Sequence, residues 1–303
     1  MKTKDYIAFI HGDLDGIVSY LVLRWTFPKR KIPYVIVNSG SDFRYILTDW
    51  MVNNNLEDYE QVFILDLDIS NNYDLIDHPN VFIIDHHESH FFNMKKCKNA
   101  KVAVKVYSSC AKLLYKLFSK LYSTKLSAPQ KLLVGLADDY DSYKLTSPLS
   151  KQLNIVFWQT NYKYESFIKQ FYNGFVNFDF YQKNMIDIYF RKLNSIQKGL
   201  KIYKGKINNN NKEYNTISTF ATEMVNDVAE YLLDTYKADI VIVVNTNSNK
   251  ASFRKNKNIG EELNLAELAE NMSDGDGGGH SYAAGCALTD KFLEFSKGLI
   301  PVK

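Results

Sequence analysis

The chain lacks the features that mark several classes of protein. It has only three cysteines, Cys97, Cys110 and Cys286, and their spacing fits neither a disulfide framework nor a zinc or redox motif. No apolar run approaches the roughly 20 residues of a membrane-spanning helix, and the apolar stretch before His11 is too short for a signal peptide. The sequence therefore argues against a disulfide-stabilised secreted protein and a membrane protein, and we expect a cytoplasmic location.

The chain also lacks a large excess of charge of either sign. Its 37 basic and 34 acidic residues leave a net charge of +3, which is too small to predict a general polyanion-binding surface, although a local basic groove is compatible with it. A length of 303 residues is more than one hydrophobic core usually fills. The composition predicts an ordinary globular enzyme with two domains.

Short β-branched and aromatic runs alternate with amphipathic segments in the first half of the chain. Strands are expected at residues 6–10, 34–37, 62–65 and 81–84. Helical spacing is found at residues 16–25, 108–121 and 129–137. Because alternation of this kind is typical of an α/β fold, we expect a parallel sheet with helices on both faces.

The second half predicts a smaller α/β domain. A long helical pattern, rich in Lys and Gln, ends near Tyr203 and is followed by Gly205 and four asparagines, which we interpret as a linker helix and a loop. Beyond it, strands are expected at residues 214–220, 239–244 and 251–254, and helices at 221–236 and 263–272. The predicted domains are a catalytic domain at 1–180, a linker helix at 181–200 and a substrate-binding domain at 201–303.

Acidic and histidine clusters follow the elements of the first domain. They are His11, Asp13 and Asp15 after the first strand, Asp66 after the third, Asp85-His86-His87 after the fourth, and Asp138-Asp139 at the end of a helical stretch. Functional groups of open parallel sheets gather outside the carboxyl ends of the strands. We therefore expect these four clusters to converge on one site.

A cluster of this composition is suited to divalent cations. A spacing of two in an extended loop directs His11, Asp13 and Asp15 to the same side, and carboxylates held so close together repel one another unless cations neutralise them. Carboxylate-rich sites with one or two imidazoles suit Mn²⁺, and sometimes Mg²⁺, Fe²⁺ or Co²⁺, better than structural zinc. Taken singly, Asp15-Gly16 and Asp66 also fit a turn and a helix cap. The four clusters together favour a two-metal hydrolase site.

These motifs resemble those of the DHH phosphoesterase superfamily, whose name describes Asp85-His86-His87. The run from His11 to Gly16 resembles its first motif, Asp66 its second, and residues 135–139 its fourth. In that register Asp139 is a metal ligand, with Asp138 and Asp141 as alternatives. The first motif has the spacing of RecJ-like and archaeal members rather than that of the oligoribonuclease and pyrophosphatase branches, so the subfamily stays open.

The second domain carries a further resemblance. Gly277-Gly278-Gly279-His280, followed by Ala283-Ala284-Gly285, resembles the signature of the DHH-associated domain, DHHA1, and residues 251–254 resemble its Ser-Leu-Arg strand. Glycines let backbone N–H groups approach an anion closely. The resemblance implies that Arg254, Gly278, Gly279 and His280 bind the substrate. Family II pyrophosphatases carry a different C-terminal domain, so phosphodiester substrates are favoured.

The resemblance also implies a mechanism. It assigns one divalent cation to His11, Asp13 and Asp66 and a second to Asp15, Asp66, His86 and Asp139, with Mn²⁺ as the first choice and Mg²⁺ or Co²⁺ as alternatives. His87 would face the substrate, and Asp85 would orient His86. Together, these residues predict metal-assisted hydrolysis of a phosphodiester.

Three functions are compatible with the sequence. A compact member of the nanoRNase type would hydrolyse short single-stranded oligonucleotides or dinucleotides to mononucleotides. The alternatives are a RecJ-like single-strand exonuclease and a non-catalytic, nucleic-acid-associated scaffold. The intact clusters disfavour the scaffold, and the weak net charge disfavours a long-strand exonuclease. The phosphodiesterase is therefore our first expectation, and the oligomeric state stays open.

Overall fold

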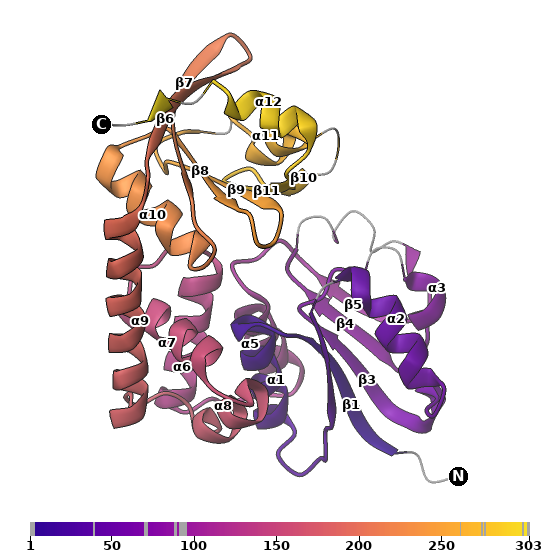
Figure 1. Cartoon of the computed structure of the whole chain (residues 1–303). Helices are drawn as coiled ribbons and strands as arrows, with labels where there is room; N and C mark the ends of the chain where they lie inside the picture. Colours follow the sequence, from indigo (N-terminus) through magenta and orange to yellow (C-terminus); the bar gives the residue numbers. More distant parts are fainter. Residues whose placement is uncertain are drawn as a thin grey trace. The chain divides into compact units, whose positions relative to one another are not determined.

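The computed structural model describes residues 4–38, 40–69, 72–87, 90, 96–260, 262–273, 275, 277–298 and 300–301. The chain divides into two compact units, Met1–Ile186 and Asp187–Lys303, and each has its own β-sheet (Figure 1). Among the described residues, no helix is long and apolar enough to cross a membrane.

The N-terminal unit is built on a parallel sheet, as predicted. Its five strands lie in the order β2-β1-β3-β4-β5, and every neighbouring pair is parallel. The strands are β1 (Lys4–His11), β2 (Tyr34–Val37), β3 (Tyr59–Leu65), β4 (Val81–Asp85) and β5 (Lys101–Val104). Four of them coincide with predicted strands, and β5 is an additional edge strand.

Helices cover both faces of this sheet (Figure 1). The helices of this unit are α1 (Leu14–Thr26), α2 (Gly40–Met51), α3 (Tyr73–Ile76), α5 (Cys110–Leu121), α6 (Ala128–Asp141), α7 (Pro148–Gln159) and α8 (Lys163–Phe171), with a 3-10 turn η1 at Leu56–Asp58. Side chains alternate along the strands, so Phe9 packs with Phe43 of α2 on one face, while Phe63 meets Phe118 of α5 on the other. The prediction of helices on both faces is confirmed.

The strand order explains why the predicted clusters meet. Strand β1 lies between β2 and β3, so the chain reverses its direction of winding at β1 and β3. A crevice forms outside the carboxyl ends of the strands at such a switch point. His11 ends β1, Asp66 directly follows β3 and Asp85 ends β4, so all three lie at this edge.

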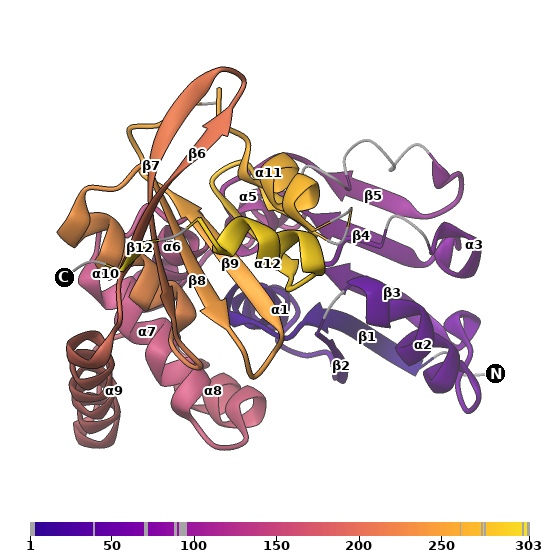
Figure 2. The same ribbon diagram turned by 45° about the horizontal axis from the view of Figure 1, so that its top comes forward.

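The C-terminal unit holds a mixed sheet in the order β10-β11-β9-β8-β7-β6-β12, in which β7, β8 and β9 run side by side (Figure 2). The strands are β6 (Tyr203–Asn209), β7 (Lys212–Phe220), β8 (Ile240–Asn245), β9 (Lys250–Lys255), β10 (Gly277–His280), β11 (Ala283–Ala287) and β12 (Ile300–Pro301). The helices are α9 (Phe180–Gly199), which begins in the N-terminal unit, α10 (Val225–Tyr236), α11 (Leu265–Met272) and α12 (Asp290–Ser296). Leu193 of α9 and Leu232 of α10 pack on one face, and Leu268 and Phe292 pack on the other.

The prediction of a loop after the linker helix is wrong over most of the segment. Residues 203–209 form β6, which pairs with β7 in a hairpin. The turn consists of Asn210 and Asn211, whose φ angles are 49° and 63°, a left-handed conformation that asparagine tolerates well. Polar side chains alternate toward solvent along β6, which hid the strand in the sequence.

Candidate metal centre

The first histidine of the site is held between backbone and carboxylates. The Nε2 atom of His11 lies 3.2 Å from the carbonyl oxygen of Asn38, while its Nδ1 atom lies 3.0 Å from Asp13 Oδ2 and 3.7 Å from Asp66 Oδ2. The Asp13 side chain also caps α1 by accepting the Gly16 N–H at 2.9 Å. A Cβ at Gly16 would lie 2.3 Å from the His11 carbonyl oxygen, so only glycine allows this close turn.

Asp66 occupies the middle of the site. It is 2% exposed, its N–H donates to the Ile84 carbonyl at 3.0 Å, and its φ of 60° is a left-handed value that costs energy in most residues. Its Oδ2 faces His11, whereas its Oδ1 lies 3.3 Å from Nε2 of His86. One carboxylate therefore lies between the two histidines, as a bridging ligand requires.

His86 faces three carboxylates with one nitrogen. Its Nδ1 atom lies 3.2 Å from the Tyr107 carbonyl oxygen, an arrangement that places the proton on Nδ1 and leaves Nε2 as the ligand atom. The Nε2 atom lies 3.3 Å from Asp66, 3.4 Å from Asp141 and 3.9 Å from Asp15. The Tyr107 carbonyl therefore has the orienting role that the sequence analysis gave to Asp85.

Asp15 is fixed by the start of another helix. Its two carboxylate oxygens accept the N–H groups of Cys110 at 2.6 Å and Ala111 at 3.1 Å. These N–H groups belong to the first turn of α5, where free donors and the helix dipole favour an anion. The bonds position Asp15, and each oxygen keeps a lone pair for a cation.

The structure brings Asp141, rather than the predicted Asp139, to the cluster. Asp139 instead accepts hydrogen bonds from the N–H of Thr146 at 3.0 Å, the N–H of Ser147 at 3.0 Å and the hydroxyl of Ser150 at 2.7 Å. It therefore fastens the loop before α7. Asp141 was one of the alternatives in the sequence, and it forms a group with Asp15 and His86.

The other alternative, Asp138, also has a structural partner. Its Oδ2 atom lies 2.6 Å from Nζ of Lys112 on α5. Asp138 and Asp139 are both buried on α6, so burial and helical spacing alone do not single out Asp141. The partners of Asp138 and Asp139, which come from other parts of the chain, decide the assignment.

Asp85 accepts hydrogen bonds from two imidazoles, and the sequence did not predict this pairing. Its Oδ1 accepts from Nδ1 of His87 at 2.7 Å, and its Oδ2 accepts from Nδ1 of His90 at 2.8 Å. Both Asp85 and His90 are fully buried. His90 was not among the residues predicted for the site. Because Asp85 fixes Nδ1 of His87, the Nε2 atom of His87 is left for a cation or a substrate.

The donor atoms fit divalent cations. Ligand atoms within 4.8 Å of one another come from three groups: His11, Asp13 and Asp66; Asp15, His86 and Asp141; and Asp66, His86 and His87. Nδ1 of His11 and Oδ1 of Asp66 are buried and lie close to Asp13 and His86, but neither makes a hydrogen bond of good geometry among the described residues. Buried polar atoms are rarely left unsatisfied, and a cation would satisfy both.

The pKa values of the clustered residues also favour binding of a divalent cation. Burial alone would lower the pKa of His11, but Asp13 and Asp66 raise it to about 11. Burial would likewise lower the pKa of His86, which Asp66 raises to about 11. Burial, followed by the charge of Asp66, raises the pKa of Asp141 to about 7. Without a cation, the cluster therefore holds protons that a metal ion would displace.

The predicted substrate-binding residues lie in the C-terminal unit. Arg254 is in β9, and its Nη2 donates to Oδ1 of Asn226 at 2.6 Å. Gly278 and Gly279 are exposed in β10, the edge strand of the sheet. The backbone of His280 pairs with Ala283, which in turn pairs with Arg254; the side chain of His280 lies outside the described part of the structure.

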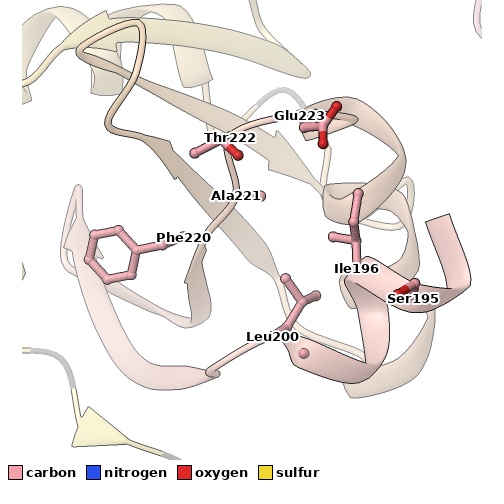
Figure 3. Close-up of a pocket in the computed structure, with 8 residues that line it drawn as sticks. Ser195, Ile196, Leu200, Phe220, Ala221, Thr222 and Glu223 are labelled. Atoms are coloured by element: carbon pink, nitrogen blue, oxygen red, sulfur yellow. The ribbon is translucent and has the colours of Figure 1, made fainter. Parts of the chain in front are cut away.

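A separate hollow of about 310 Å³ lies elsewhere in the C-terminal unit (Figure 3). Its walls are mainly apolar and include Ile196, Leu200 and Phe220, with Glu223 at the side. Glu223 pairs with Lys192. None of the predicted substrate-binding residues lines this hollow.

Two domain models match the chain. The model described as DHH family, N-terminal domain, matches residues 6–138, and the DHHA1 domain model matches residues 211–300. A search of the curated protein sequences finds no significant match.

Solved structures share the fold. A pGpG-specific phosphodiesterase, PggH, from Vibrio cholerae has 17% identity and a TM-score of 0.58, with 97% of this chain and 96% of that chain covered. RecJ in complex with Mn²⁺ from Thermus thermophilus has 14% identity and a TM-score of 0.56, with 98% and 51% covered. An exonuclease RecJ bound to manganese has 14% identity and a TM-score of 0.52, with 97% and 88% covered. The two domain matches, which together span most of the chain, show that it belongs to the DHH/DHHA1 phosphoesterase superfamily.

Proposed function

We propose that the protein is a metal-dependent phosphodiesterase that hydrolyses short oligonucleotides or dinucleotides to mononucleotides. The observation that carries the proposal is the convergence of carboxylates and imidazoles around Asp66, which is buried at the centre of the cluster. Such a site suits hard divalent cations, and superfamily membership makes a phosphoester the substrate class.

We assign the ligands of two cations from the observed groups. His11, Asp13 and Asp66 would hold one, and Asp15, Asp66, His86 and Asp141 would hold the other, so that Asp141 replaces Asp139 in the predicted set. Divalent cations held there would neutralise the phosphate and make a water molecule more acidic. Mn²⁺ is the proposed ion, and structures of RecJ with Mn²⁺ and with Mg²⁺ support a divalent cation.

We propose that His87 donates a proton during the reaction and that Asp85 orients it. Burial would lower the pKa of His87, but Asp85 raises it to about 9, which keeps the imidazole protonated at neutral pH. A protonated His87 can donate from Nε2 to the leaving oxygen of the substrate. Asp85 acts through His87 by fixing the orientation of its ring.

The C-terminal unit is proposed to bind the rest of the nucleotide. The guanidinium of Arg254 suits a phosphate, and the exposed backbone of Gly278 and Gly279 allows an anion or a ribose to approach closely. The lack of a side chain at Gly278 has no packing reason, since no described heavy atom lies within 4 Å of a Cβ built there. Open space at this position fits a substrate surface.

Substrate length separates this function from a RecJ-like exonuclease. A small net charge of +3 favours short substrates, because binding a long strand relies on many phosphate contacts. The likeness to the pGpG-specific phosphodiesterase, which covers nearly all of both chains, supports the same choice.

A length series tests the proposal. Hydrolysis of RNA and DNA from dinucleotide to 30-mer is measured with Mn²⁺ and with chelator at several salt concentrations. We expect the highest rates below about five nucleotides and only weak dependence on salt. A preference for long strands that falls steeply with salt would favour the exonuclease, and inactivity on the whole series with metal would favour the scaffold.

A further inference from the structure

The N-terminal unit has a second pocket, distant from the metal centre. Its volume is about 480 Å³, within the usual range for small-molecule sites. Arg24, in the last turn of α1, contributes to its wall, whereas Asp13 caps the first turn of the same helix. With a rise of about 1.5 Å per residue, Arg24 and Asp13 are roughly 15 Å apart along α1. The pocket therefore cannot share a phosphate with the metal centre.

The guanidinium of Arg24 has hydrogen-bond acceptors for only some of its donors among the described residues. Its Nη1 donates to the hydroxyl of Tyr20 at 3.2 Å, and the group lies 5.9 Å from the ring centre of Tyr20 and 5.8 Å from that of Tyr172. Its Nε is buried and has no hydrogen-bond partner among the described residues. No described carboxylate forms an ion pair with Arg24; Glu165, on the pocket wall, interacts with the hydroxyl of Tyr34 instead.

The Nε–H of Arg24 therefore lacks an acceptor among the described residues. On that edge of a guanidinium, Nε–H and the neighbouring Nη2–H form a fork that matches two oxygens of a phosphate. A buried donor without a partner costs free energy, and an oxyanion would supply the missing acceptors as well as the missing negative charge. Lys169 adds a second cation at the exposed side of the pocket.

The remaining walls suit a planar ring. Tyr20 is 2% exposed and packs against Tyr34, with 4.9 Å between the ring centres. The partly exposed surfaces of the pocket come from Tyr34, Tyr172 and Ile168, which are half-buried around it. Aromatic side chains stack readily on nucleobases. We propose that this pocket is a binding site for a nucleoside monophosphate, with its phosphate on Arg24 and its base against the tyrosines.

Calorimetric titration of the full chain tests this site. Chelator and the variant Asp66→Asn prevent phosphate from binding through cations at the metal centre. The probes are AMP, ribose 5-phosphate, adenosine and inorganic phosphate. We expect AMP to bind most tightly, and Arg24→Gln to weaken AMP binding at least about tenfold. Arg44→Gln is the matched control, because Arg44 is an exposed arginine paired with Asp74 in the same unit.

A second variant keeps the test decisive if Arg24→Gln unfolds the protein. Asn173 is exposed on the pocket wall, and Asn173→Trp should block the pocket without disturbing the buried residues. AMP binding should then fall at least about tenfold, by comparison with the loss of a charged hydrogen bond. No binding of AMP at millimolar concentration, equal binding by Asn173→Trp, or AMP binding no tighter than inorganic phosphate would each overturn the proposal.

Discussion

Oδ1 of Asp66 lies 3.3 Å from Nε2 of His86, across the carboxyl ends of β3 and β4. The same carboxylate faces His11 with its other oxygen, and it stands on a backbone with a φ of 60°. A strained backbone at a buried polar residue persists when the surroundings enforce it, which is common at functional sites. The geometry places one buried carboxylate between two imidazoles.

Asp141→Asn should weaken metal binding, whereas Asp139→Asn should not. Asp141 faces His86, and the loss of a ligand charge should lower Mn²⁺ affinity by about tenfold or more, by analogy with partners of metal ligands. Asp139→Asn would weaken charged hydrogen bonds to the loop at residues 146–150 and lower the free energy of unfolding by about 1–3 kcal/mol. Metal titration and chemical denaturation of both variants provide the check. Loss of metal in the Asp139 variant alone would reverse our assignment.

Metal binding should release protons at pH 7. In the metal-free cluster, carboxylates raise the pKa values of His11 and His86 to about 11, so both imidazoles are protonated at neutral pH. A ligand nitrogen must lose its proton, so the apparent affinity should rise with pH. Calorimetry of Mn²⁺ binding in two buffers with different ionisation enthalpies measures the protons released. Equal heats in the two buffers would be inconsistent with this protonation.

Asp85→Asn should move the alkaline limit of activity to lower pH. The Asp85 carboxylate raises the pKa of His87 to about 9 against the effect of burial, and removal of its charge lowers that pKa. If His87 donates the proton to the leaving group, the rate falls as pH rises through its pKa. The pH profile of kcat should therefore break at a lower pH in the variant than in the wild type. An unchanged break would remove His87 from this role.

Gly278→Ala should raise KM without destabilising the protein. No described heavy atom would contact the added methyl group, so the melting temperature should stay within a few degrees of the wild type. A substrate that approaches the backbone at this point would meet the methyl group, and KM should rise several-fold. Gly135→Ala is the control, since Gly135 on α6 also has open space. An equal KM in both variants would show that substrate does not contact Gly278.

The sheet of the N-terminal unit was predictable because its strands are buried on both faces. Runs such as 81–84 are wholly apolar, as is typical of parallel sheets covered by helices. By contrast, β6 alternates between exposed and partly buried side chains, and glycine and asparagine along it have low strand propensity. Strand β6 forms because it pairs with β7, and the strand propensities of its own residues do not predict that pairing.

The candidate site was predictable where it follows the strand ends. His11, Asp66 and His86 come together because parallel strands end at one edge of the sheet. The Asp139 assignment failed because a carboxylate at the end of a helix can serve either a cation or a loop, and the deciding hydrogen bonds come from residues 146–150. Backbone carbonyls of Asn38 and Tyr107 orient His11 and His86. Because every residue has such a carbonyl, the sequence does not reveal these two contacts.

The most direct test is turnover of the dinucleotide pGpG with Mn²⁺, with chelator, and by Asp66→Asn. Asparagine tolerates a left-handed backbone, so this variant keeps the conformation at φ 60° and removes only the bridging charge. We expect hydrolysis by the wild type with Mn²⁺, none with chelator, and a loss of about a thousandfold or more in the variant. Turnover that survives both chelation and Asp66→Asn would show that hydrolysis does not depend on a metal site at Asp66.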